Sequence, residues 1–120
     1  MQNYKELNIW KKSFEIAKEV YLISKEFPQS ENFGLISQVR RCAVSVPSNI
    51  AEGSSRNSDK DFCRFLEIAL GSSFELQTQL ELAKDVLILN NDQIDNILNN
   101  INENQKMIRG FVIKLRKDVK

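Results

Sequence analysis

The side chains most able to do chemistry in this chain lie in one short stretch, QVRRCAVSVPSNIAEGSSR, which covers residues 38–56. Ser45 and Ser48 could act as nucleophiles, but a serine needs an adjacent base, and the chain contains no histidine. A lysine could replace histidine as the base, yet none lies within this stretch. Glu52 and Arg56 are four residues apart, a spacing typical of a solvated ion pair on a helix. The stretch therefore argues against an enzyme.

Metal and cofactor chemistry has equally little support in the sequence. Zinc sites usually take four Cys or His ligands, whereas the chain has only Cys42 and Cys63 and no histidine. Both cysteines fall at or beside core positions, so we expect buried free thiols. The phosphate-binding pattern G-x-x-x-x-G-K-[ST] is absent, and GSSRNS before a helix start is only a weak anion-binding signal. We expect no metal and no cofactor.

Length and composition indicate one ordinary globular domain. The chain has 120 residues, which predicts a single domain over residues 1–120, large enough to bury a core. No apolar run approaches the roughly 20 residues that span a bilayer, and the charged N-terminus lacks a signal-peptide core. We therefore expect a cytoplasmic protein with no membrane partner.

Apolar residues recur every three or four positions through four segments, and no strand-like alternation competes with this helical period. The expected helices run from about Asn8 to Glu26, from Glu31 to Ser54, from Ser58 to Leu89, and from Asp92 onward. Ser58 is expected to cap the third helix, and the short polar connectors favour antiparallel neighbours. The sequence thus predicts an all-α, up-down-up-down antiparallel four-helix bundle.

Pro47 lies inside the second predicted helix. The apolar face stays in phase across it, through Val39, Cys42, Ala43, Val46 and Ile50. We expect a continuous but kinked helix; the alternative is a break, with Pro47 starting a new helix. Because proline has no N–H, the Ala43 carbonyl loses its helical partner, which a water or a nearby hydroxyl could replace. Small residues in the third helix, Gly71, Ser72 and Ser73, predict close approach between helices.

The first predicted helix carries two apolar stripes. One consists of Ile9, Ile16, Val20, Ile23 and Phe27, and the other of Trp10, Phe14, Ala17 and Tyr21. One bundle seam needs a face about 100° wide. The excess indicates either a second surface buried against another chain or a wide core face. We expect Trp10 and Tyr21 to be buried, which makes base stacking on them improbable.

Three segments carry a family resemblance: YKELNIWKKSFEIAKEVY, FGLISQVRRCAVSVPSNIAEGSSR and DFCRFLEIALGSSFEL. They resemble the four-helix-bundle family encoded in intervening sequences of bacterial 23S ribosomal RNA genes. The most specific part stands here as Arg40, Arg41, Ala43, Ser45, Pro47, Ser48, Asn49, Ile50, Ala51, Glu52 and Gly53. The resemblance implies a bundle that assembles as a cyclic homo-oligomer, with a pentamer expected, and no established enzymatic activity.

A related branch of the family is the accessory protein of diversity-generating retroelements. The resemblance to that branch implies a basic barrel that engages nucleic acid and a reverse transcriptase. This chain departs from the branch because its formal net charge is only +1.

The charges are nevertheless unevenly distributed along the chain. Residues 65–103 carry seven acidic side chains against Lys84 alone, and residues 104–120 carry six basic side chains against Asp118. An up-down bundle would gather basic residues at the end that holds both termini and acidic residues at the other end. Cations at the end of the fourth helix also suit its dipole, so simple solvation is the alternative.

We expect the basic end to bind RNA or a ribonucleoprotein; the competing hypothesis is a protein-interaction scaffold that meets an acidic protein. The candidate contact residues are Arg40, Arg41, Arg56, Lys60, Arg64, Lys114, Arg116 and Lys117. The family-motif residues expected to be structural are Ser45, Pro47, Ser48, Asn49, Glu52 and Gly53.

Overall fold

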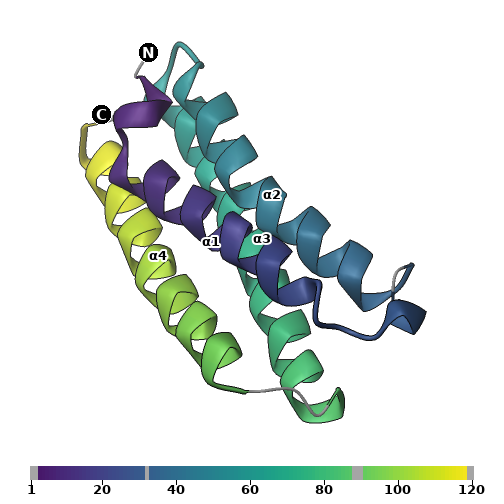
Figure 1. The fold of residues 1–120 in the computed structure, drawn as a ribbon. Helices are drawn as coiled ribbons and strands as arrows, with labels where there is room; N and C mark the ends of the chain where they lie inside the picture. The colour runs from purple at the N-terminus through teal and green to yellow at the C-terminus, as the bar shows by residue number, and fades with distance from the viewer. Residues whose placement is uncertain (1–2, 32, 88–90, 119–120) are drawn as a thin grey trace.

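Four long helices make up the fold in a computed structural model of the chain (Figure 1). The structure describes residues 3–31, 33–87 and 91–118. The helices are α1 (Asn8–Ser24), α2 (Leu35–Ser54), α3 (Asp59–Val86) and α4 (Asn91–Asp118), with short 3-10 turns at η1 (Tyr4–Glu6) and η2 (Gln29–Glu31). No strand occurs in these ranges. The predicted all-α, four-helix fold is confirmed.

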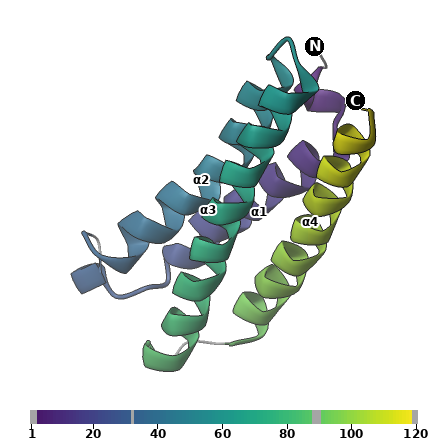
Figure 2. The same cartoon turned by 180° about the vertical axis from the view of Figure 1, so that it is seen from behind.

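The helices are arranged so that neighbours in sequence are neighbours in space. Cα atoms within 8 Å join α1 to α2, α2 to α3, α3 to α4 and α4 back to α1, whereas no Cα atoms of the diagonal pairs come this close within the described ranges. Both chain ends and the α2–α3 turn lie at one end of the bundle, here called the terminal end (Figures 1 and 2). The ends of α1 and α3 and the starts of α2 and α4 lie at the opposite, distal end. Successive helices therefore alternate in direction.

Helix boundaries differ from the expected ones by a few residues. α1 ends at Ser24, two residues before the expected end, and α2 begins at Leu35 instead of near Glu31. Glu31 closes a 3-10 turn instead, and its carboxylate accepts a hydrogen bond from the Leu35 N–H (3.3 Å). The expected cap at Ser58 is confirmed, because its Oγ accepts from the Asp61 N–H (3.1 Å). The expected end of the third helix at Leu89 lies outside the described residues.

A polar layer divides the apolar core into two clusters. The terminal cluster contains Ile9, Val46, Ile50, Phe62, Cys63, Leu66, Ala69, Ile108, Val112 and Leu115. The distal cluster contains Ile16, Ala17, Val20, Ile23, Phe27, Ile36, Val39, Cys42, Ala43, Leu76, Leu80, Ala83, Ile94, Ile97 and Ile101. Between them along their helices lie four buried polar residues, Ser13, Ser73, Asn104 and Gln105.

The polar layer is held by hydrogen bonds between helices. Gln105 on α4 donates from Nε2 to Ser73 Oγ (3.1 Å) and to Gln77 Oε1 (3.0 Å), both on α3. Asn104 on α4 donates from Nδ2 to the Ile9 carbonyl on α1 (3.1 Å). Gln105, which interrupts the apolar stripe of the fourth helix in the sequence, therefore joins α3 to α4. These bonds offset the cost of burying polar groups in the core.

Helix α2 continues through Pro47 without a break, and the proline ring is buried. The alternative of two separate helices is wrong, because residues 35–54 are helical throughout. The kink stays a prediction.

Replacing Pro47 with alanine tests how far the proline is tolerated. We expect Pro47→Ala to keep the fold, because the restored N–H can bond the Ala43 carbonyl and alanine favours a helix interior by about 3 kcal/mol over proline. Losing buried ring carbons costs about 0.8 kcal/mol per methylene. Urea unfolding followed by circular dichroism should show an unchanged or higher free energy of unfolding. A variant that unfolds would mean that the packing requires the proline.

Candidate nucleic-acid interface

Gly53 allows α2 and α3 to approach closely near the terminal end. A Cβ atom at this position would lie 2.7 Å from Phe65 Cβ and 2.9 Å from Phe62 Cδ1. Real Cβ atoms do not approach other atoms so closely, so any larger residue must push the two helices apart. The glycine of the family pattern therefore serves packing at the α2–α3 contact.

Two further residues of the pattern, Ser45 and Asn49, are hydrogen-bonded to each other, and Ser45 also reaches α3. Ser45 Oγ lies 2.8 Å from Ser72 Oγ, a hydrogen bond that joins α2 to α3. Asn49, one turn further along α2, donates from Nδ2 to the Ser45 carbonyl (2.8 Å) and to Ser45 Oγ (3.1 Å). The Ser45 hydroxyl is thus occupied by structural partners. Ser48 and Glu52 are exposed on the outer side of α2.

The small residues of α3 do not all behave as expected. Ser72 contacts α2 and Ser73 contacts α4, which confirms close approach at these two positions. Gly71, however, is exposed, and a Cβ atom there would meet nothing within 4 Å. The expectation for Gly71 was wrong, because adjacent helical positions point about 100° apart and only two of the three can face neighbours.

The terminal end gathers basic side chains from α1, α3 and α4, from η1 and from the α2–α3 turn. Those described there are Lys5, Lys11, Lys12, Arg56, Lys60, Arg64, Lys114, Arg116 and Lys117. Lys120, which an up-down bundle would also bring to this end, lies outside the described residues. At the distal end, Lys84 on α3 bonds Asp95 on α4 (2.7 Å), and this bond raises the pKa of Lys84.

Part of the basic charge at the terminal end is neutralised locally. Arg56 pairs with Glu52 (3.1 Å), Arg64 with Asp61 (3.4 Å) and Arg116 with Glu67. Lys12 on α1 pairs with Glu103 on α4 (2.8 Å), and this lysine lowers the pKa of Glu103. The other basic residues, namely Lys5, Lys11, Lys60, Lys114 and Lys117, have no acidic partner in the described ranges. The available positive charge is therefore mostly lysine.

Phe65 fixes two of the arginines beside the α2–α3 turn. The Cζ of Arg56 lies 4.7 Å from the ring centroid and the Cζ of Arg64 lies 4.6 Å from it. Arg56 Nε is buried, and no acceptor among the described residues bonds it. The Phe65 ring is the nearby group whose π electrons can interact favourably with this N–H. Arg56 also bonds Glu52 at the end of α2, and Arg64 bonds Asp61 on α3. Both guanidinium groups are therefore held in place before any ligand arrives.

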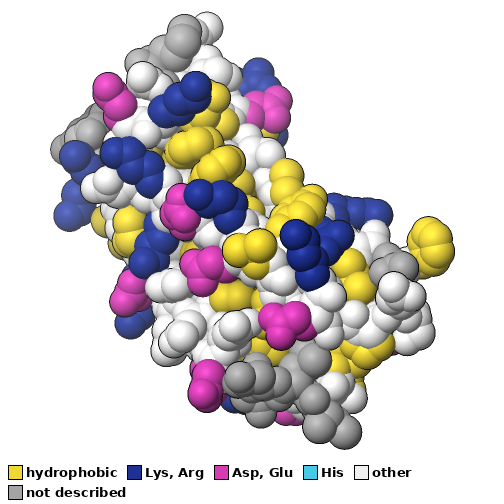
Figure 3. Space-filling model, in the orientation of Figure 1, with side chains coloured by type: hydrophobic (Ala, Val, Ile, Leu, Met, Phe, Trp, Pro, Cys, Tyr) yellow, Lys and Arg dark blue, Asp and Glu magenta, His cyan; other side chains and the backbone are white. Residues whose placement is uncertain are grey.

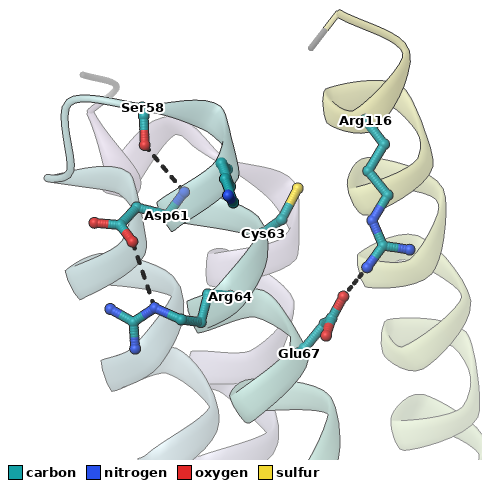
Figure 4. Close-up of a pocket in the computed structure, with 7 residues that line it drawn as sticks. Ser58, Asp61, Cys63, Arg64, Glu67 and Arg116 are labelled. Carbon is teal, nitrogen blue, oxygen red and sulfur yellow. Dashed lines mark hydrogen bonds and ion pairs between the residues drawn. The ribbon is translucent and has the colours of Figure 1, made fainter. Parts of the chain in front are cut away.

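An open groove lies between α3 and α4 at the terminal end (Figure 4). Its volume is about 550 Å³, and it is lined by Ser58, Lys60, Asp61, Cys63, Arg64, Glu67 and Arg116. Arg116 reaches from α4 to Glu67 on α3, and the Cys63 thiol points toward α4 (Figure 4). Burial raises the pKa of this thiol, which keeps it protonated and a poor nucleophile. Both cysteines are buried and free, as predicted.

Two of the predicted contact residues lie elsewhere. Arg40 holds α2 against α1: its Nε donates to Ser24 Oγ (2.8 Å) and its guanidinium carbon lies 4.9 Å from the Tyr21 ring centroid. Arg41 is exposed near the start of α2, on the distal half of the bundle. The fold therefore brings Arg56, Lys60, Arg64, Lys114, Arg116 and Lys117 together but leaves Arg40 and Arg41 apart.

The second apolar stripe of α1 is partly open to solvent, as the yellow side chains along α1 in Figure 3 illustrate. Phe14 and Tyr21 are each 42% exposed, so the expectation that Tyr21 is buried was wrong. Trp10 is half-buried, with its ring stacked on Phe14 (4.9 Å between centroids) and edge-on to Tyr4 (5.1 Å). Ala17 of this stripe belongs to the distal cluster and Trp10 packs against the terminal cluster, so the part that stays open to solvent is centred on Phe14 and Tyr21.

Comparison with known proteins identifies the family. The model of the 23S rRNA-intervening sequence protein family matches residues 5–110. The chain belongs to this family. It is also similar to a crystal structure of a protein of unknown function from the S23 ribosomal protein family of Bacteroides thetaiotaomicron. The TM-score is 0.79 at 27% identity, over 87% of this chain and 97% of that chain. No curated protein matches the chain.

The family match confirms the resemblance that the motif residues indicated. The relation to the accessory protein of diversity-generating retroelements stays a prediction. None of the described helices is long and apolar enough to cross a membrane. The described residues also contain no cluster of three or more His, Cys, Asp or Glu that could hold a metal ion.

The α2–α3 contact predicts opposite effects for two glycine-to-alanine changes. Gly53→Ala should lower the free energy of unfolding by about 1–3 kcal/mol, because its Cβ overlaps Phe65 and Phe62. Gly71→Ala is the matched control, and it should raise stability by about 0.5–1 kcal/mol through helix propensity alone. Urea unfolding of both variants measures the difference. Equal stabilisation by the two changes would contradict the close approach at Gly53.

Proposed function

We propose that this protein is a non-catalytic, homo-oligomeric binding protein that holds RNA, or a ribonucleoprotein, at its terminal end. The observation that carries the proposal is the set of unpaired, exposed lysines there, with Lys60 on α3 and Lys114 and Lys117 on α4. Their ammonium groups suit phosphates, which are the shared feature of any RNA sequence. Such a role would place the protein in the cytoplasm.

Several features support a binding role over catalysis. Ser45, the more enclosed of the two candidate serines, is bonded to Ser72 and Asn49 instead of a base. The thiols of Cys42 and Cys63 both have a raised pKa, with burial as the main cause. A nucleophile with a depressed pKa or an adjacent base would be needed for covalent chemistry. Recognition through charge needs neither.

The exposed aromatic stripe of α1 supports self-association. Phe14 and Tyr21 lie on it, and exposed Lys11 and Lys18 flank it on the same helix. The outer side of α3 offers a surface of opposite charge, with exposed apolar Ile68, Leu82 and Val86 among the acidic residues Glu75, Glu81 and Asp85. Contact between two different surfaces of one chain is heterologous, and when the rotation closes it produces a ring.

A ring of several copies would strengthen RNA binding that is weak for a single chain. With its axis roughly parallel to the bundles, every terminal end would face the same side, and several lysine clusters would act as one field. The family resemblance suggests five copies. The competing function is a scaffold whose basic side meets an acidic protein, which the same lysines would also serve.

Charge reversal at the terminal end tests the RNA proposal. We expect Lys114→Glu combined with Lys117→Glu to weaken binding of a single-stranded RNA by about tenfold or more at low salt, because phosphate contacts are lost. The salt dependence should also become shallower by roughly 0.7 log units per lost contact. Fluorescence anisotropy across a salt series measures both quantities.

The matched control reverses two exposed charges away from the terminal end, Lys25→Glu with Arg41→Glu, and should leave affinity within about twofold after correction for net charge. An equal loss of RNA affinity in both double variants would show that the terminal end is not the RNA-binding surface. If the unaltered protein binds neither RNA nor DNA at low salt, the scaffold function takes its place.

Light scattering coupled to gel filtration tests self-association. The unaltered chain should elute as a species several times its 13.9 kDa mass, because the aromatic stripe would be covered by a second copy. Phe14→Glu combined with Tyr21→Glu should shift the protein toward monomer, whereas the control Glu15→Gln should not. A monomer at micromolar concentration for the unaltered chain would refute the homo-oligomer.

A further inference from the structure

A small cavity lies at the polar layer between the two core clusters. It is lined by Ser13 and Ile16 of α1, Ala43 and Val46 of α2, Ser73 and Leu76 of α3, and Ile101 and Asn104 of α4. None of these residues is more than 4% exposed, and the cavity volume is about 10 Å³. That volume is about the lower limit for one water molecule. The cavity is thus buried, touches all four helices and has space for a single small polar guest.

The polar side chains around this cavity retain hydrogen-bonding capacity. Ser73 Oγ accepts from Gln105, and within the described ranges no acceptor receives its own proton. Asn104 Nδ2 donates to the Ile9 carbonyl, while no described donor reaches its Oδ1. Ser13 Oγ donates to the Trp10 carbonyl (2.9 Å), and its lone pairs remain available. Each of these side chains already makes one hydrogen bond, and a bound water would use the capacity that remains.

Helix α2 supplies a backbone acceptor at the same level. Ala43 lines the cavity, and its carbonyl would ordinarily bond the N–H of the residue four positions later. That residue is Pro47, which has no N–H. Pro47 therefore leaves the Ala43 carbonyl without its helical donor. The same cavity is bordered by the Ser73 hydroxyl, which can donate, and by Asn104 Oδ1, which can accept.

We propose that the cavity holds one structural water molecule. The water accepts a hydrogen bond from the Ser73 hydroxyl and donates to Asn104 Oδ1 and to the Ala43 carbonyl. These three partners come from α3, α4 and α2, so a single molecule joins three helices at the centre of the bundle. Three hydrogen bonds are the usual number for buried water in proteins. The site does not depend on what the terminal end binds, so the two proposals stand or fall separately.

Oxygen-17 magnetic relaxation dispersion tests the site directly, because it counts internal waters that stay bound longer than the protein takes to tumble. We expect the unaltered chain to hold at least one such water. Asn104→Leu, which removes the acceptor and fills the space with an apolar side chain, should reduce the count by one water per chain. Ser73→Val should do the same by removing the donor.

Ser54→Ala is the matched control. Ser54 is a buried serine (2% exposed) whose hydroxyl donates to the Ala51 carbonyl within α2, and it does not border the cavity. Its loss should leave the water count unchanged. The proposal is overturned if the unaltered chain holds no long-lived water, a result that does not depend on whether any variant folds. It is also overturned if folded Asn104→Leu and Ser73→Val proteins retain the same count as Ser54→Ala.

Discussion

The terminal end depends on how closely α2 and α3 approach at Gly53. The helix backbones can meet there only because position 53 has no side chain, and the space it leaves is taken by Phe65 and Phe62. The Phe65 ring in turn contacts the guanidinium groups of Arg56, in the α2–α3 turn, and of Arg64, on α3. Packing between apolar groups therefore decides where the charges of the candidate site stand. The family pattern at residues 45–53 therefore serves to bring α2 and α3 close together.

A second constraint lies in the middle of the bundle, where polar residues interrupt the core. A core of the same volume made only of apolar residues would avoid the cost of burying Ser73, Asn104 and Gln105. Their hydrogen bonds are directional, however, and Gln105 can meet Ser73 and Gln77 only if α3 and α4 keep their present register. The polar layer and Pro47 occupy the same level of the bundle, which ties the irregularity of α2 to the interior of the protein.

The sequence predicts the helices well because their information is local. The seam of α3, from Phe62 through Leu66 to Ala83, is buried along its length, and Ser58 caps the helix through a bond three residues away. The start of α2 was misjudged because Glu31 can cap a helix as easily as continue one.

The side-chain partners of the candidate site were much harder to predict, because they join residues far apart in sequence. Arg116 and Glu67 are 49 positions apart, and nothing in either local pattern indicates that they pair. Arg40 looked like a contact residue because it is a conspicuous cation, but its partners Ser24 and Tyr21 lie on another helix. The periodicity of α1 likewise showed two stripes without showing which one the core would take. Exposure and pairing are set by tertiary packing.

Lysine footprinting tests the central claim, that the terminal end is the surface which meets RNA. The protein would be acylated with and without a single-stranded RNA at low salt, and modification at each lysine would be read by mass spectrometry. The account predicts strong protection at Lys60, Lys114 and Lys117, all exposed at the terminal end, and little change at Lys18 and Lys25. Equal protection of all five lysines, or protection confined to Lys18 and Lys25, would contradict it.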